Sequence, residues 1–68
     1  GRSSAWANLA EIYAIKNNSE EAVAALVLAF QFSSNKDRTI NFLNDRAADT
    51  TSPLQATAKK TIDVIQKL

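Results

Sequence analysis

Nine consecutive apolar residues, AVAALVLAF at positions 22–30, constrain the fold of this chain more than any other feature. A helix on a protein surface shows one apolar stripe, whereas a helix that is apolar all round must be covered on several sides. The run is too short to cross a bilayer, which takes about 20 such residues, so we expect no membrane span. We therefore predict that residues 20–32 form a central helix with other segments, or a partner, packed around it.

The chain contains almost none of the residues that interrupt helices, since its only glycine is Gly1 and its only proline is Pro53. Such a sequence predicts helices joined by short polar turns. No segment shows the period-two alternation that is typical of strands. We predict one all-α domain, 1–68, with four short helices that cover 4–16, 20–32, 36–48 and a last stretch beginning at Pro53.

Polar residues between these helices carry the signals for where each helix starts and stops. Ser, Thr, Asp and Asn side chains accept hydrogen bonds from the free N–H groups of a first turn, and a capping box adds a reciprocal bond. Asn tolerates the left-handed conformation that ends many helices. The expected N-caps are Ser3 or Ser4, then Ser19, then Ser34 in a capping box with Asp37, then Ser52 in a capping box with Gln55; Asn17 is expected to end the first helix.

Composition excludes several classes of function. The chain has no cysteine and no histidine, which removes disulfides, thiolate metal sites and the commonest general base. Its seven carboxylates are scattered, and eight basic residues leave a formal charge of only +1. We therefore expect no enzyme activity, no metal or cofactor, and no nucleic-acid partner, because a nucleic-acid binder carries a clustered basic surface.

The apolar positions repeat along the chain. The face formed by Trp6, Leu9, Ala10 and Tyr13 recurs 34 residues later as Ile40, Leu43, Asn44 and Ala47. The row of Ala22, Leu26 and Ala29 in the second helix recurs as Ala58, Ile62 and Ile65 in the fourth. These matches predict two helix-turn-helix hairpins, 3–34 and 35–68, stacked on each other around one interior.

A Trp, a Leu, a small residue and a Tyr at these spacings, within a period of 34 residues, resemble a tetratricopeptide repeat (TPR). The resemblance is fair over 3–34, and the second hairpin resembles a degenerate repeat. An unrelated four-helix bundle would share the same core and is the alternative. The resemblance implies an α-solenoid fragment that acts as a scaffold or adaptor and binds a protein or peptide partner.

In proteins of this family the first helices of successive repeats line a concave surface. The resemblance therefore implies a partner-binding groove. We expect the groove to be lined by Ala7, Glu11 and Ala14 from the first helix and by Arg38, Asn41, Phe42 and Asp45 from the third. Phe42 lies off the apolar stripe of its helix, so we expect it to be exposed and to anchor a partner, unless it packs on the fourth helix or on a neighbouring chain. With Glu11 and Asp45 opposed to Arg38, a mixed or basic peptide is the expected ligand.

A second hypothesis uses the apolar helix itself. Two hairpins do not obviously cover every side of residues 20–32, and Leu28 and Phe32 lie on the side that remains. These two residues could pack on a preceding repeat of a longer array, or join two copies of the chain as a homodimer, which is the alternative function. The other helices could also cover them. The chain lacks an initiator Met and opens with Gly1-Arg2, which cloning can leave behind, so we expect it to belong to a larger protein or assembly.

Overall fold

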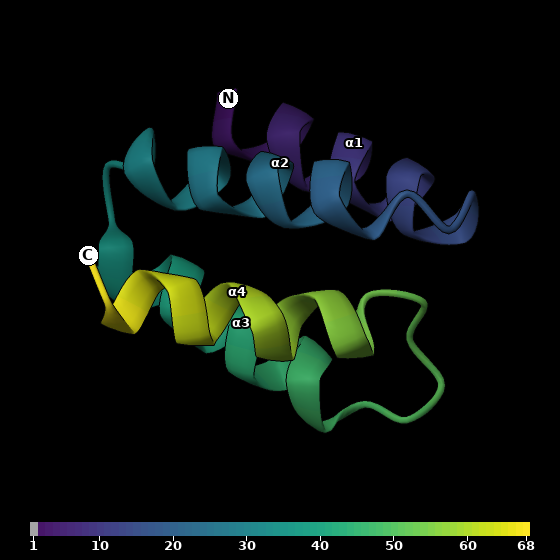
Figure 1. The fold of residues 1–68 in the computed structure, drawn as a ribbon. Coiled ribbons are helices and arrows are strands. Elements are labelled where there is room, and N and C mark those ends of the chain that lie inside the picture. The colour runs from purple at the N-terminus through teal and green to yellow at the C-terminus, as the bar shows by residue number, and fades with distance from the viewer. Residues whose placement is uncertain (1) are drawn as a thin grey trace.

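The computed structural model describes the backbone of residues 2–68 and the side chains of residues 4–68. It contains four helices: α1 (Arg2–Ile15), α2 (Ser19–Gln31), α3 (Lys36–Ala48) and α4 (Gln55–Gln66) (Figure 1). No strand occurs between residues 2 and 68. The prediction of an all-α fold with four short helices is therefore confirmed.

The four helices form two antiparallel hairpins that lie against each other. Figure 1 shows α1 paired with α2 in the first hairpin and α3 paired with α4 in the second. Helix α2 contacts all three of the other helices and packs more extensively on α4 than on α3. The apolar run at 22–30 thus lies in the central helix, as its composition predicts.

Small side chains bring α2 close to its neighbours. Ala10 of α1, Ala22, Ala25 and Ala29 of α2, and Ala58 of α4 are all buried. Larger residues fill the interior around these contacts, with Leu26 only 1% exposed and Leu43 and Leu54 also buried. Trp6 is half-buried and packs against this core, as expected. Two buried threonines lie on α4, where the Thr61 hydroxyl donates to the Thr57 carbonyl over 2.7 Å.

The end of α1 follows the sequence prediction. Asn17 has φ of 62°, in the left-handed region that Asn tolerates better than most residues. The Asn18 N–H donates to the Tyr13 carbonyl over 2.8 Å, and the Asn17 N–H donates to the Ala14 carbonyl over 3.1 Å. This pair of bonds is the Schellman motif, which satisfies carbonyls that the helix would otherwise leave free.

The predicted N-caps of the first three helices are wrong. Ser4 lies inside α1, which begins at Arg2, and the side chain of Ser3 lies outside the described residues. Ser19 is the first residue of α2 rather than its cap, and the residue before it makes no side-chain capping bond. At α3 the cap is Asn35, not Ser34, because the Asn35 Oδ1 accepts from the Arg38 N–H over 3.1 Å.

The predicted start of α4 is correct in part. The Ser52 hydroxyl accepts from the Leu54 N–H over 3.1 Å, as a capping residue does, but Pro53 and Leu54 form a turn and α4 begins at Gln55. Gln55 does not complete a capping box. Its Nε2 donates to the Ala47 carbonyl over 3.3 Å and so links the start of α4 to the end of α3.

Lys36 joins the two hairpins at the turn between α2 and α3. Its ammonium donates to the carbonyls of Phe30, Gln31 and Ser33 at 3.0, 3.3 and 3.2 Å. The same nitrogen lies 5.1 Å from the centroid of the Phe30 ring. A cation at the C-terminal end of a helix is stabilised by its dipole, so Lys36 closes α2 with charge and hydrogen bonds together.

We predict that Leu26→Ala lowers the free energy of unfolding by about 2–5 kcal/mol, because it leaves a cavity where α2 meets the rest of the core. Ile15→Ala removes a side chain that is 65% exposed and should change the free energy of unfolding by less than about 0.5 kcal/mol. Urea denaturation followed by circular dichroism measures both values. Equal losses for the two variants would show that Leu26 is not a core residue.

Candidate interaction groove

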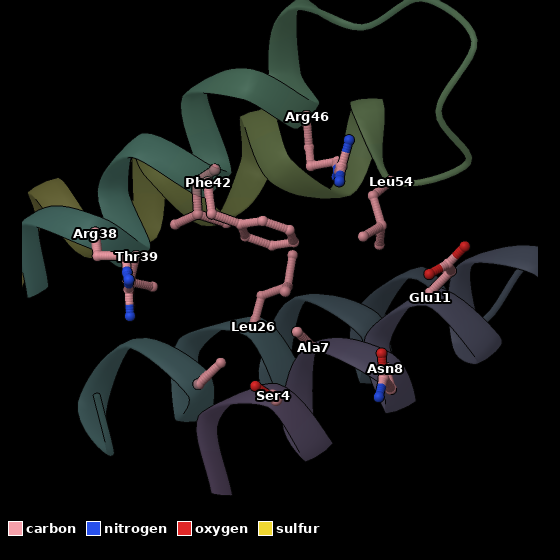
Figure 2. A pocket seen from close by; sticks show the side chains of 12 residues that line it. Ser4, Ala7, Asn8, Glu11, Leu26, Arg38, Thr39, Phe42, Arg46 and Leu54 are labelled. Carbon is pink, nitrogen blue, oxygen red and sulfur yellow. The ribbon is translucent and has the colours of Figure 1, made fainter. Parts of the chain in front are cut away.

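An open groove of about 400 Å³ lies between the two hairpins, on the side where α1 and α3 face each other (Figure 2). Helix α1 forms one wall and α3 the other. Leu26 and Ala29 of α2, together with Leu43 and Leu54, line its apolar depth. The wall residues are Ser4, Ala7, Asn8 and Glu11 from α1 and Arg38, Thr39, Phe42 and Arg46 from α3.

Helical spacing explains why these residues share a groove. On α1 the lining residues recur at intervals of three and four, which places them along one side of a helix. On α3, Arg38, Phe42 and Arg46 are each four residues apart and form a single row. Ala7 is small, so the α1 wall stays low opposite the ring of Phe42. Because a large side chain on one wall lies opposite a small side chain on the other, as Phe42 lies opposite Ala7, the space between the walls stays open.

Phe42 is the largest apolar side chain in the groove. It is half-buried and packs against the core of the domain, while its ring faces the groove (Figure 2). The expectation that it would be exposed is wrong, because one side of the residue packs against the core. The guanidinium of Arg46 lies 5.2 Å from the ring centroid, a cation–π contact that fixes Arg46 at the groove wall.

The structure brings four of the seven expected groove residues together: Ala7, Glu11, Arg38 and Phe42 all line the groove. Ala14 is half-buried and packs against the core. Asn41 and Asp45 are exposed on α3 and are not among the groove residues. Arg46 lines the groove but was not among the expected residues, although its position four residues after Phe42 on a helix was a sufficient signal.

The presence of Arg46 and the absence of Asp45 give the groove a different charge from the expected one. The expectation of a mixed or basic ligand depended on Asp45, which lies outside it. Arg46 lines the groove instead, so two guanidinium groups, those of Arg38 and Arg46, stand with the single carboxylate of Glu11.

A smaller hollow of about 270 Å³ continues the groove past Glu11, Arg46 and Leu54 toward the turn between α3 and α4. Arg46 is paired there with Asp49, at 4.0 Å between Nη1 and Oδ2. The Asp49 Oδ1 accepts from the Thr51 hydroxyl at 2.6 Å and from the Thr51 N–H at 3.0 Å. These two bonds, led by that of the hydroxyl and aided by Arg46, hold the pKa of Asp49 below its ordinary value of 3.8.

The residues of the second hypothesis lie on α2 and at its end. Phe32 is 53% exposed, whereas Leu28 is half-buried. Two isoleucines of α1, Ile12 and Ile15, are also 49% and 65% exposed. Helix α1 is therefore less one-sided than the predicted face of Trp6, Leu9, Ala10 and Tyr13 implies.

Within the described residues, no helix is both long enough and apolar enough to cross a membrane. The same residues contain no group of three or more acidic side chains arranged to hold a metal ion. Comparisons with models of protein families, with curated proteins and with solved structures give no significant match to this chain. The resemblance to a tetratricopeptide repeat therefore stays a prediction.

We predict that Thr51→Val raises the pKa of Asp49 toward its ordinary value, because the variant keeps the N–H bond and loses the hydroxyl bond. A depressed carboxylate pKa stabilises the fold at pH values above the unfolded pKa, and this contribution is lost as the pH falls through the folded pKa. Thr51→Val should therefore lower the melting temperature slightly at neutral pH and less at pH 2.

A carboxyl-carbon NMR titration measures the pKa directly. Thr50→Val is the matched control, since Thr50 is next to Asp49 in the chain, whereas the hydroxyl that donates to Asp49 is that of Thr51. If both variants leave the titration of Asp49 unchanged, the Thr51 hydroxyl is not the cause of its depressed pKa.

Proposed function

We propose that this domain is a protein-interaction module that binds a segment of a partner protein in the groove between α1 and α3. The observation that carries the proposal is the half-buried ring of Phe42, which faces an open groove with an apolar floor and charged walls. Aromatic side chains and arginines are the residues that most often dominate the energy of interfaces. The resemblance to a tetratricopeptide repeat supports the same site, since it implies a groove on the first helices of both hairpins.

The chemistry of the lining favours binding over catalysis. Its side chains offer guanidinium, carboxylate, amide and hydroxyl groups around an apolar floor. The sequence supplies no histidine or cysteine to activate a nucleophile or to hold a metal. We therefore propose a scaffold or adaptor role rather than an enzymatic one.

The test is site-specific cross-linking in extracts of the source cell. A photoreactive benzoylphenylalanine at Asn8, which is exposed and lines the groove, should cross-link to a protein partner. The same group at Asn41, which is exposed on α3 outside the groove, should give little of that product. Mass spectrometry of the cross-linked band identifies the partner segment.

A second variant separates groove binding from unspecific capture. Ala7→Lys should abolish the Asn8 cross-link, since it places a long side chain opposite Phe42. Because Ala7 is half-buried and packs against the core, circular dichroism must first show that the variant is folded at the temperature of the experiment. Equal cross-linking from positions 8 and 41, with no effect of Ala7→Lys, would contradict the proposal.

One observation favours the alternative, a homodimer formed through the side of α2. Phe32 is 53% exposed at the end of this helix, next to a half-buried Leu28. A large exposed aromatic residue is a suitable anchor for a second copy.

If α2 joins two copies, sedimentation equilibrium should show a mass that rises with protein concentration toward twice 7.4 kDa. Phe32→Ser should then shift the domain to monomer. Ile15→Ser is the control, because Ile15 is also highly exposed but ends α1, which lies at the opposite end of the first hairpin from the end of α2 (Figure 1). A monomer at all concentrations would exclude this alternative.

A further inference from the structure

The groove has ends of opposite charge. Arg38 stands at one end with Ser4 across from it, and Glu11 stands at the other end near Leu54 (Figure 2). Arg46 and Asp49 also lie at the Glu11 end, where they line one hollow with Glu11 and approach each other at 4.0 Å, so the three groups together give this end a net charge of −1. A ligand therefore meets the guanidinium of Arg38 at one end and a net negative charge around Glu11 at the other.

The backbones of both walls reinforce this polarity. Helices α1 and α3 run in the same direction, each from the Arg38 end of the groove toward the Glu11 end. A helix carries partial positive charge at its N-terminus and partial negative charge at its C-terminus. The dipoles of the two walls therefore add to the fields of Arg38 and Glu11.

A helix fits this groove better than an extended strand. An extended peptide must find partners for its backbone N–H and C=O groups, whereas a helix satisfies them internally. Most of the backbone around the groove is already hydrogen-bonded within helices, so the groove offers a partner little besides side chains. The row of Arg38, Phe42 and Arg46 at intervals of four also suits ridge-into-groove packing of a third helix.

We propose that the groove binds an amphipathic helix of the partner that runs antiparallel to α1 and α3. Its last turn carries a carboxylate that faces Arg38, its middle carries an apolar side chain that packs on Phe42, and its first turn carries a cation that faces Glu11. This inference rests on the proposed function and adds the direction and charge pattern of the ligand. Ser4 and Glu11 are about 10 Å apart along α1, so the two ligand charges lie about two turns apart.

The experiment uses two designed peptides, each a helix of alanines with a central leucine, blocked termini and a hydrocarbon staple on its outer face. One carries Lys in its first turn and Glu in its last turn, and the other carries the same residues exchanged. The exchanged peptide has charges that favour an isolated helix, so intrinsic helicity works against the expected result. The staple and a circular dichroism measurement equalise the helicity of the two.

Fluorescence anisotropy at low salt should show the peptide with Lys first and Glu last binding about tenfold more tightly, because exchange turns two attractions into two repulsions. The preference should shrink at high salt. The protein variant Arg38→Glu with Glu11→Lys changes two exposed residues and should prefer the exchanged peptide. Asn41→Lys adds a charge to α3 outside the groove and should leave the parental preference.

Equal affinity of the two peptides, or a preference that survives the double charge reversal, overturns this inference. If neither peptide binds although the Asn8 cross-link to a partner forms, the groove does not take a helix and the inference also fails, while the proposed function stands. If the cross-link is absent as well, both fail.

Discussion

The close packing of α2 against three other helices is the contact on which the rest of the structure depends. Alanines on α1, α2 and α4 make it possible, because a side chain of one carbon lets helix axes approach while still burying apolar surface. A domain of 68 residues has a thin margin of stability, so this shared interior must serve both hairpins at once. Neither hairpin has a separate core, and the position of one relative to the other follows from what each buries on α2.

The groove is a consequence of the same packing. Helix α2 contacts α4 more extensively than α3, so α3 is held away from α1 and the space between them is floored by Leu26 and Ala29. Phe42 and Leu54 limit this space without filling it. The polar walls then differ from the floor in a way that is common at binding sites, where an apolar centre is surrounded by charged groups that determine orientation.

Two sets of polar interactions stabilise the turns at the two ends of α3. Lys36 binds three carbonyls at the end of α2 and lies over the ring of Phe30, which fixes the turn into α3. Asp49 binds Thr51 and pairs with Arg46, which fixes the exit from α3. Both act at the ends of the groove wall formed by α3, so the row that carries Arg38 and Phe42 is anchored at its start and at its finish.

The sequence by itself determined the class of the fold, the number of helices and the central place of α2. These depend on local properties, namely a continuous apolar run, the scarcity of glycine and proline, and the tolerance of Asn17 for positive φ. It also placed Ala7, Glu11, Arg38 and Phe42 at one site through the resemblance to a known repeat. The tertiary structure decided which residues cap the helices, how far Phe42 is buried, and that Arg46 rather than Asp45 lines the groove. The groove lining and the burial of Phe42 depend on the rotation of each helix about its axis, since a shift of one residue turns a side chain by about 100°. The caps depend on competition between neighbouring polar groups, as between Ser34 and Asn35.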